Sequence, residues 1–260
     1  MLGKLICFDM KSSARLLLPL HLALLAASIV GRFLMSFDII NRIPDIYLGL
    51  MIAFYVILIV CTGIISSFYF IYWFYKNLFT DEGYLMHTLP VPSWQHIVSK
   101  FTGMLLWEVI DASVILLCLT LLITSDASYV LMIPVYARKL LQQMAADLQT
   151  TVPVLILVSL LIFILQMLAR GLSAFFCITL GQLFNRHRVL SAFLSYIVFS
   201  IVISVLSAAL LSATGYDTAC ANTTQAMHMA TAWEIIGDLA LALLCFFGTN
   251  YLMKRRLNLE

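Results

Sequence analysis

A small set of ionisable residues lies inside long apolar stretches of the chain, where they could hold a proton, pair with one another or contact a cargo. They are Arg32, Glu108, Asp111, Arg170, Glu234 and Asp238. Each costs about 2.5–3.5 kcal/mol to place in a bilayer, so each needs a partner or a function. Glu108 and Asp111 are three residues apart and therefore share one face of a helix. We expect Arg170 to pair with one of them, either to transmit motion or only to neutralise buried charge.

The other three ionisable residues form a second candidate set near the opposite ends of their stretches. Glu234 and Asp238 are four residues apart, so they lie on one side of a helix. Arg32 could pair with either acid. Alternatively, Glu234 could extend to the membrane interface, whereas Asp238 lies deeper in its stretch.

The sequence lacks the residue patterns that are typical of metal-binding and nucleotide-phosphate-binding sites. The five His form no HxxxH or HExxH pair and the six Cys form no CxxC pair, so we predict no metal site. The 11 Gly contain no G-x-x-x-x-G-K-[ST] phosphate loop. The sequence therefore offers no phosphate-loop site in this chain.

The composition defines the environment in which these residues work. The chain is 63% hydrophobic and only 11% charged, whereas a soluble domain is about 45–50% apolar and about 25% charged. Too few charges are present to cover a water-exposed surface, which excludes a soluble enzyme or a nucleic-acid-binding protein. The expected surroundings are membrane lipid.

Six stretches are long enough to cross a bilayer, for which about 20 apolar residues are needed. The clearest lie between Asp45 and Lys76 and between Arg188 and Asp217, where no charged residue occurs. We predict an all-α integral membrane protein with one domain over residues 1–260. Its expected spans are residues 16–36, 48–74, 101–124, 149–180, 189–213 and 232–253.

The basic residues predict the orientation of these spans, because Lys and Arg concentrate in cytoplasmic loops. With both termini inside, ten basic residues lie on the cytoplasmic side. They are Lys4, Lys11, Arg15, Lys76, Lys100, Arg186, Arg188, Lys254, Arg255 and Arg256. Three lie outside, namely Arg42, Arg138 and Lys139. We therefore predict an N-in, C-in topology.

Two amphipathic segments flank the spans. Residues 1–15 mix apolar and basic side chains, which suits a helix that lies along the inner membrane surface. On the outer side, Pro134 is expected to open a second helix with apolar residues largely on one face. These residues are Tyr136, Leu140, Leu141, Met144 and Leu148.

The longest cytoplasmic loop, residues 75–101, joins the second and third spans. Thr80 is a candidate N-cap, and Asp81 and Glu82 would then fall in the first turn of a short helix, where the helix dipole favours acids. Pro90 is expected to end that helix. Such a helix could receive another protein, or it could be a solvated turn that only joins two spans.

This loop resembles that of bacterial permeases of the ABC transporter type 2 family. The resemblance rests on Lys76-Asn77-Leu78-Phe79-Thr80-Asp81-Glu82-Gly83-Tyr84-Leu85, Thr88-Leu89-Pro90-Val91 and Ser99-Lys100. It implies an N-terminal elbow helix over residues 1–15 and a cytoplasmic coupling helix that docks on a separate ATPase. The coupling residues that it implies are Asp81, Glu82, Gly83, Tyr84, Leu85, Thr88, Leu89 and Pro90.

The resemblance also implies a function and partners. The chain would be the non-catalytic permease subunit of an ATP-driven exporter in the plasma membrane of a Gram-positive bacterium. Two copies of an ATP-binding subunit would hold ATP and Mg, and a second permease, identical or homologous, would complete the assembly. The implied cargo is amphipathic, such as an antimicrobial peptide or a lipid-like compound.

The residues also allow two alternative functions to be compared with the sequence, a secondary transporter and an intramembrane hydrolase. A secondary transporter could use Asp111, Arg170 or Asp238 as a proton site, but neither inverted repeats nor broken helices are visible in the sequence. An intramembrane hydrolase would need paired Glu residues with two intramembrane His, or a Ser–His pair at one depth. His21 is the only His in the middle of a span, which disfavours that alternative.

Overall fold

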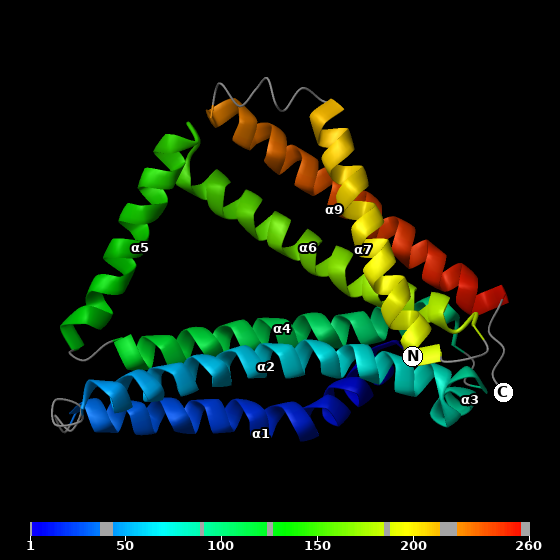
Figure 1. Cartoon of the computed structure of the whole chain (residues 1–260), viewed down its shortest axis with the longest axis horizontal. Coiled ribbons are helices and arrows are strands. Elements are labelled where there is room, and N and C mark those ends of the chain that lie inside the picture. The colour runs from blue at the N-terminus through cyan, green and yellow to red at the C-terminus, as the bar shows by residue number, and fades with distance from the viewer. Residues whose placement is uncertain are drawn as a thin grey trace. The chain divides into compact units, whose positions relative to one another are not determined.

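The computed structural model describes residues 2–36, 44–88, 91–123, 127–184, 188–213 and 223–255, and these ranges contain helices and no strand (Figure 1). The all-α prediction is therefore confirmed for this part of the chain. The helices are α1 Leu2–Ser36, α2 Asp45–Phe79, α3 Asp81–Thr88, α4 Ser93–Ile123, α5 Ala127–Asp147, α6 Val152–Gly181, α7 Arg188–Ala213 and α9 Thr223–Arg255.

Six of these helices are long and apolar enough to cross a membrane: α1, α2, α4, α6, α7 and α9. Many of their large apolar side chains are exposed rather than buried in a protein core. On α7, which has no buried residue, Val189, Phe193, Ile201 and Val205 are all more than half exposed. Such a surface is stable only in lipid, so the chain is a multi-pass membrane protein.

Most helices extend beyond the predicted spans. The second was expected over residues 48–74, whereas α2 runs to Phe79, and the third was expected from residue 101, whereas α4 begins at Ser93. The apolar pattern indicates only the part of a helix that crosses hydrocarbon, and polar flanks can continue the same helix into the headgroup region. The predicted loop of residues 75–101 is correspondingly shorter.

The basic residues counted for orientation are described only in part. Arg42, Arg186 and Arg256 lie outside the described residues. The N-in, C-in topology stays a prediction.

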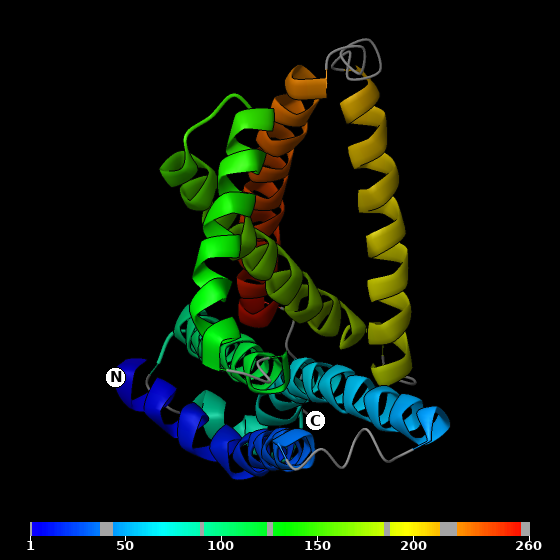
Figure 2. The same ribbon diagram turned by 90° about the vertical axis from the view of Figure 1, so that its left-hand side faces the viewer.

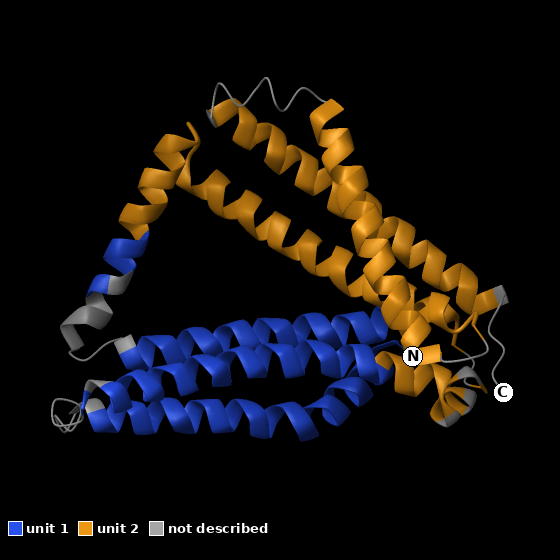
Figure 3. Cartoon of the chain, viewed as in Figure 1, with its two compact units in different colours: residues 1–73, 98–137 blue, residues 74–97, 138–260 orange. Residues whose placement is uncertain are grey.

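The chain forms two compact units, which are coloured separately in Figure 3. Unit 1 comprises Met1–Trp73 and Val98–Ala137, and within it α1, α2 and α4 pack together. Two glycines on these helices lie close to neighbouring side chains. A Cβ at Gly31 on α1 would lie 2.9 Å from a methyl group of Leu122 on α4, and one at Gly103 on α4 would contact Phe70 and Asp9. The three helices are therefore closely packed along much of their length.

Residues 2–15 are continuous with the first span. α1 has no break between Leu2 and Ser36, although Pro19 lies inside it and α1 bends in its N-terminal half (Figure 1). Proline lacks the N–H that would bond to the carbonyl of Arg15 and its ring crowds that carbonyl, which accounts for the bend. The surface position of residues 1–15 stays a prediction.

Unit 2 comprises Phe74–Ile97 and Arg138–Glu260. In it α6 packs against both α9 and α7, and the neighbouring positions of α6 and α9 are visible in Figures 1 and 2. A Cβ at Gly181 would lie 2.6 Å from the backbone of Ala192, and one at Gly248 would lie 2.6 Å from the ring of Phe176. Small residues thus allow α7 and α9 to approach α6 closely, as is common in membrane bundles.

The helix expected to begin at Pro134 begins earlier. α5 starts at Ala127, so Pro134 lies inside it, and the prediction that this proline opens the helix is wrong. Proline is favoured in a first helical turn but is also tolerated within a helix at the loss of one backbone hydrogen bond. Tyr136, Leu140 and Met144 are all exposed, as is expected of an apolar helix face that contacts lipid.

The end of α5 has a specific backbone geometry. Gln149 has a φ of 51°, in the left-handed region that favours glycine. Its N–H bonds to the carbonyl of Ala146 at 3.0 Å, and the N–H of Thr150 bonds to that of Ala145 at 2.8 Å. These two bonds define a Schellman motif, which ends α5 and turns the chain toward α6.

Candidate functional site

The short helix predicted between the second and third spans is present as α3, Asp81–Thr88, and its cytoplasmic location stays a prediction. The carbonyl of Thr80 accepts the N–H of Gly83 at 2.7 Å, which places Thr80 at the expected N-cap position. Its hydroxyl, however, donates to the carbonyl of Lys76 at 2.5 Å and so closes α2 instead of capping α3. Leu89 and Pro90 lie outside the described residues.

The absence of a side chain at Gly83 allows α3 to lie directly against the end of α2. Gly83 is buried, and a Cβ there would lie 2.6 Å from the carbonyl carbon of Leu78. Because the obstacle is backbone, it cannot move aside as a flexible side chain could. Leu78 and Phe74 are fully buried, and the ring of Phe74 stacks on Phe175 of α6 at a centroid distance of 3.9 Å.

The outer surface of α3 carries both acidic and apolar side chains. Glu82 and Leu85 are exposed, Leu85 by 69%. Glu82 forms a half-exposed ion pair with Lys76 at 3.0 Å. The hydroxyl of Thr88 donates to the carbonyl of Leu85 at 2.7 Å within the helix. The helical positions of Asp81 and Tyr84 are described, but their side chains are not.

One predicted residue, Asp111, belongs to a polar seam within unit 1. We use this name for Asp9, Ser13 and His21 on α1 together with Lys100, Trp107 and Asp111 on α4. The α1 members belong to a stripe of side chains that are each at most 5% exposed. This stripe is Asp9, Ser13, Leu17, His21, Leu24 and Ser28. Its spacing of three or four residues places every member on one face of the helix.

A buried ion pair forms one end of the polar seam. Lys100 donates to Asp9, and both side chains are 2% exposed. Ser99 donates to the other carboxylate oxygen at 2.7 Å, and the indole nitrogen of Trp73 donates to the first at 3.3 Å. The Lys100 ammonium also lies 5.1 Å from the centre of a Trp73 ring. A buried charge needs such a complete set of partners.

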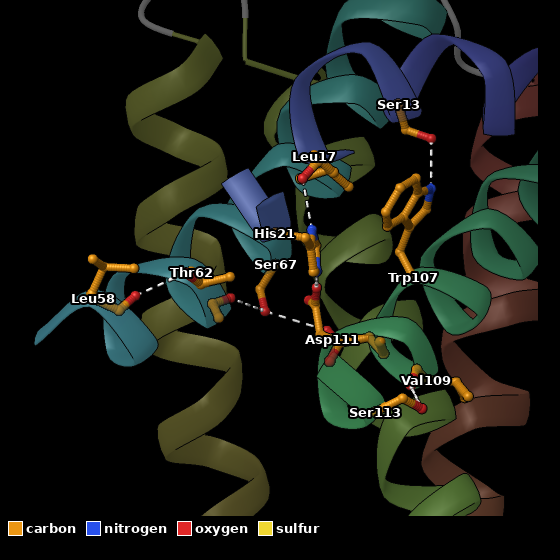
Figure 4. A network of polar contacts seen from close by, with 12 residues as sticks. Ser13, Leu17, His21, Leu58, Thr62, Ser67, Trp107, Val109, Asp111 and Ser113 are labelled. Carbon is orange, nitrogen blue, oxygen red and sulfur yellow. Dashed lines mark hydrogen bonds and ion pairs between the residues drawn. The ribbon is translucent and has the colours of Figure 1, made fainter. Parts of the chain in front are cut away.

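The other end of the polar seam joins His21 and Asp111 (Figure 4). The second ring nitrogen of His21, Nδ1, lies 2.6 Å from the carbonyl of Leu17. Between the two ends, the indole of Trp107 donates to Ser13 at 2.8 Å, and its rings lie 5.6 Å from that of His21. These polar contacts of the seam join α1 to α4 and α1 to α2, or stay within α1.

Glu108 lies beside the polar seam on the α2 side of α4. Its carboxylate accepts a hydrogen bond from Ser67 of α2 at 3.3 Å. Glu108 and Asp111, predicted to share one helix face, therefore contact different neighbouring helices.

Arg170 lies in unit 2, whereas Glu108 and Asp111 lie in unit 1. Their predicted pairing stays a prediction. Arg170 is exposed, donates to the carbonyl and side chain of Gln166 on its own helix, and acts electrostatically on Asp238 of α9. Glu234 is exposed, and the predicted pairing of Arg32 with Glu234 or Asp238 also joins the two units and stays a prediction.

Asp9 and His21 were not predicted as site residues, and Lys100 was used only for the topology and as part of the motif that carries the family resemblance. Asp9 lies in the segment that was expected at the membrane surface. The signal that could have found them is the spacing of Asp9, Ser13 and His21, which places polar residues in register on one face. Within the described ranges, no group of His, Cys, Asp and Glu side chains could hold a metal ion.

Fold and site together define a multi-pass membrane protein with a buried polar seam and a short exposed helix between two of its spans. In comparisons with known proteins, no family model, no curated protein and no solved structure matches the chain.

Proposed function

We propose that the chain is the permease subunit of an ATP-driven exporter of the ABC transporter type 2 kind. The observation that carries the proposal is α3, a short helix held against the end of α2 by Gly83, with Glu82 and Leu85 exposed on its surface. An exposed acid and an exposed apolar side chain on a helix whose position is set by close backbone contact with α2 form a surface that another protein can contact.

The contacts of Ser99 and Lys100 support the same proposal. These two residues end the motif that carries the family resemblance, and both bind Asp9 on α1. The chain that leaves the exposed helix is thereby attached to the N-terminal part of the first span. A displacement of this segment would be passed to α1 through an ion pair that costs several kcal/mol to break.

The length of α1 supports an interfacial role for its first turns. Its 35 residues would extend about 50 Å at 1.5 Å per residue, well beyond a hydrocarbon core of about 30 Å. In the proposed N-in, C-in arrangement, residues 1–15 form the elbow helix at the cytoplasmic interface. α3 then lies in the cytoplasm as the coupling helix.

The proposed assembly contains two copies of a separate ATP-binding subunit, which hold ATP and Mg, and a second permease, identical or homologous. Its location would be the plasma membrane of a Gram-positive bacterium. The cargo would be amphipathic, such as an antimicrobial peptide or lipid-like compound. The direction of transport and the cargo class rest on the family resemblance alone.

Co-purification tests this function. The chain is extracted from its native membrane in a mild detergent, and proteins that accompany it are assayed for ATP binding. We expect an ATP-binding subunit to accompany the unaltered chain and to be lost from Glu82→Lys. Asp147→Lys, which makes the same charge change at an exposed site on α5, serves as the matched control.

A charge-swapped variant separates docking from local stability. Glu82→Lys also breaks the ion pair with Lys76, whereas Lys76→Glu combined with Glu82→Lys restores a pair of opposite sign. If Glu82 contacts the partner, the double variant stays defective. Recovery of the complex in the double variant, or the absence of any ATP-binding protein with the unaltered chain, would contradict the proposal.

A further inference from the structure

The orientation of His21 determines where one of its protons lies. Nδ1 is 2.6 Å from the backbone carbonyl of Leu17, one helical turn earlier. A carbonyl oxygen can only accept a hydrogen bond, so Nδ1 must carry the hydrogen. In a neutral imidazole the other nitrogen, Nε2, then has only a lone pair.

The partner of Nε2 is the carboxyl group of Asp111. An ionised carboxylate also offers only lone pairs, and two acceptors cannot form a hydrogen bond. One additional proton must therefore lie between Nε2 and Oδ1. The pair is either an imidazolium with a carboxylate or a neutral imidazole with a carboxylic acid, and both forms have zero net charge.

We propose that His21 and Asp111 form a proton-binding site inside the membrane, in which one shared proton holds α1 to α4. The ligand is a proton rather than ATP or an exported compound, so the inference goes beyond the proposed function and does not depend on it. Release of the proton leaves a neutral His21 facing an ionised Asp111, with a net charge of minus one. The contact between the helices then lacks its hydrogen bond, and the carboxylate is buried without a donor.

Burial makes the protonated pair the favoured form. His21 and Asp111 are each 5% exposed, and the rings of Trp107 lie 5.6 Å from the imidazole. An unpaired charge in such surroundings is costly, whereas a neutral pair is not. The two residues lie on different helices, α1 and α4, and are 90 residues apart in the chain. The shared proton therefore forms a tertiary contact between two helices that are far apart in the sequence.

The titratable groups around the pair come from all three helices of the bundle. On α4, Glu108 accepts a hydrogen bond from Ser67 of α2, and an ionised Glu108 would repel a second negative charge at Asp111. Toward one end of α1 lies the Asp9–Lys100 pair, whose charges cancel. Toward the other, Tyr55 of α2 is hydrogen-bonded to Ser28 at 2.9 Å. Among these described contacts of unit 1, none brings a second positively charged group to His21 and Asp111 that could replace the shared proton.

Spectroscopy of the full chain in lipid nanodiscs tests the proposal. Nitrogen-15 NMR of labelled histidine reports the protonation of each imidazole nitrogen, and an infrared carbonyl band reports a protonated carboxyl group. The His21 signals are assigned by their loss in His21→Gln or, if that variant does not fold, by the one resonance set that shifts in Asp111→Asn. The exposed His228 on α9 serves as the internal control.

We expect one of two signatures to persist from about pH 6 to about pH 8, the range in which an ordinary imidazole changes its charge. Either His21 is an imidazolium throughout, or a protonated carboxyl band is present that Asp111→Asn removes. The proposal is overturned if the His21 signals change to those of a neutral imidazole within this range and no such carboxyl band exists at any pH in the range.

A stability measurement tests the consequence for α1 and α4. In Asp111→Asn, the amide can donate permanently to Nε2, so the bond no longer depends on a proton. We expect the unaltered chain to lose several degrees of thermal stability in alkaline solution and Asp111→Asn to lose less. Glu108→Gln should keep the pH dependence of the unaltered chain. Equal pH dependence in all three proteins would contradict a role for the shared proton.

Discussion

Lys100 donates a hydrogen bond to Asp9 across the polar seam, and both side chains are withdrawn from solvent. The pair joins the start of α4 to the N-terminal part of α1 in unit 1. Two charges this deeply buried compensate one another only if both are present, because either alone would be an isolated ion in a medium of low dielectric constant. The first prediction concerns this dependence.

Removing one partner of the pair should be far more damaging than removing both. We expect Lys100→Met to lower the free energy of unfolding by about 3–5 kcal/mol, and Asp9→Leu to have a similar effect. The double variant should recover most of this loss, since two apolar side chains can replace a buried pair. Unfolding in detergent measures all three, with Lys139→Met at an exposed site as the control. If the losses in the free energy of unfolding of the two single variants add in the double variant, the two charges are not coupled.

The contact between Gly83 and Leu78 predicts a defect that is local to α3. We expect Gly83→Ala to displace α3 and to reduce the yield of the co-purified ATP-binding subunit, because the added Cβ meets backbone at 2.6 Å. The matched control is Gly63→Ala on α2, where a Cβ would meet nothing within 4 Å. This control should be neutral or more stable by about 1 kcal/mol, since alanine is the better helix former. Equal behaviour of the two variants would contradict the close approach.

The left-handed backbone of Gln149 predicts a stabilising change. Gln149→Gly should raise the free energy of unfolding by about 1 kcal/mol, because glycine adopts a positive φ without the steric cost of a Cβ. Gln143→Gly, an exposed position within α5, should instead lower it by about 1 kcal/mol. Thermal unfolding of both variants decides the matter, and a loss of stability in Gln149→Gly would show that this turn is not a Schellman motif.

Arg170 has one electrostatic partner in unit 2 and two predicted partners in unit 1. Double-mutant cycles that pair Arg170→Ala with Asp238→Ala, Glu108→Ala and Asp111→Ala would rank these partners by their coupling energies. We expect coupling of about 0.5–1 kcal/mol with Asp238, which lies across the α6–α9 contact, and less with the other two. Stronger coupling to Glu108 or Asp111 would favour the pairing predicted from the sequence.

The spans could be predicted from the sequence because the bilayer sets a length that any apolar run must meet. α3 was also predictable, since Thr80, Asp81 and Pro90 mark a short helix in a polar loop. The helix start at Pro134 was not, because the same residue is compatible with a first turn or an interior position. Local signals therefore indicated elements more reliably than their limits.

The polar seam was beyond this kind of prediction because it depends on which helices face one another. Asp9 and Lys100 are 91 residues apart, and the sequence around each residue does not indicate which residue it will contact. The rule that intramembrane charges need partners singled out Asp111 and predicted a charged partner, Arg170, for Glu108 or Asp111. His21 was overlooked as a partner of Asp111, although a histidine can supply the proton that a buried carboxyl group needs.

The separation of the seam's two halves along the chain has a consequence for how the protein is made. α1, with Asp9 and His21 on its buried face, leaves the ribosome well before α4 brings Lys100 and Asp111, which are about 90 residues later. At about 5–20 residues per second, the interval is roughly 5 to 20 s. During this time the polar stripe of α1 lacks its partners on α4, although Tyr55 and Trp73 of α2 can contact Ser28 and Asp9, and α1 is poorly suited to bare lipid. Its release into the bilayer should therefore wait at the insertion machinery until α4 arrives.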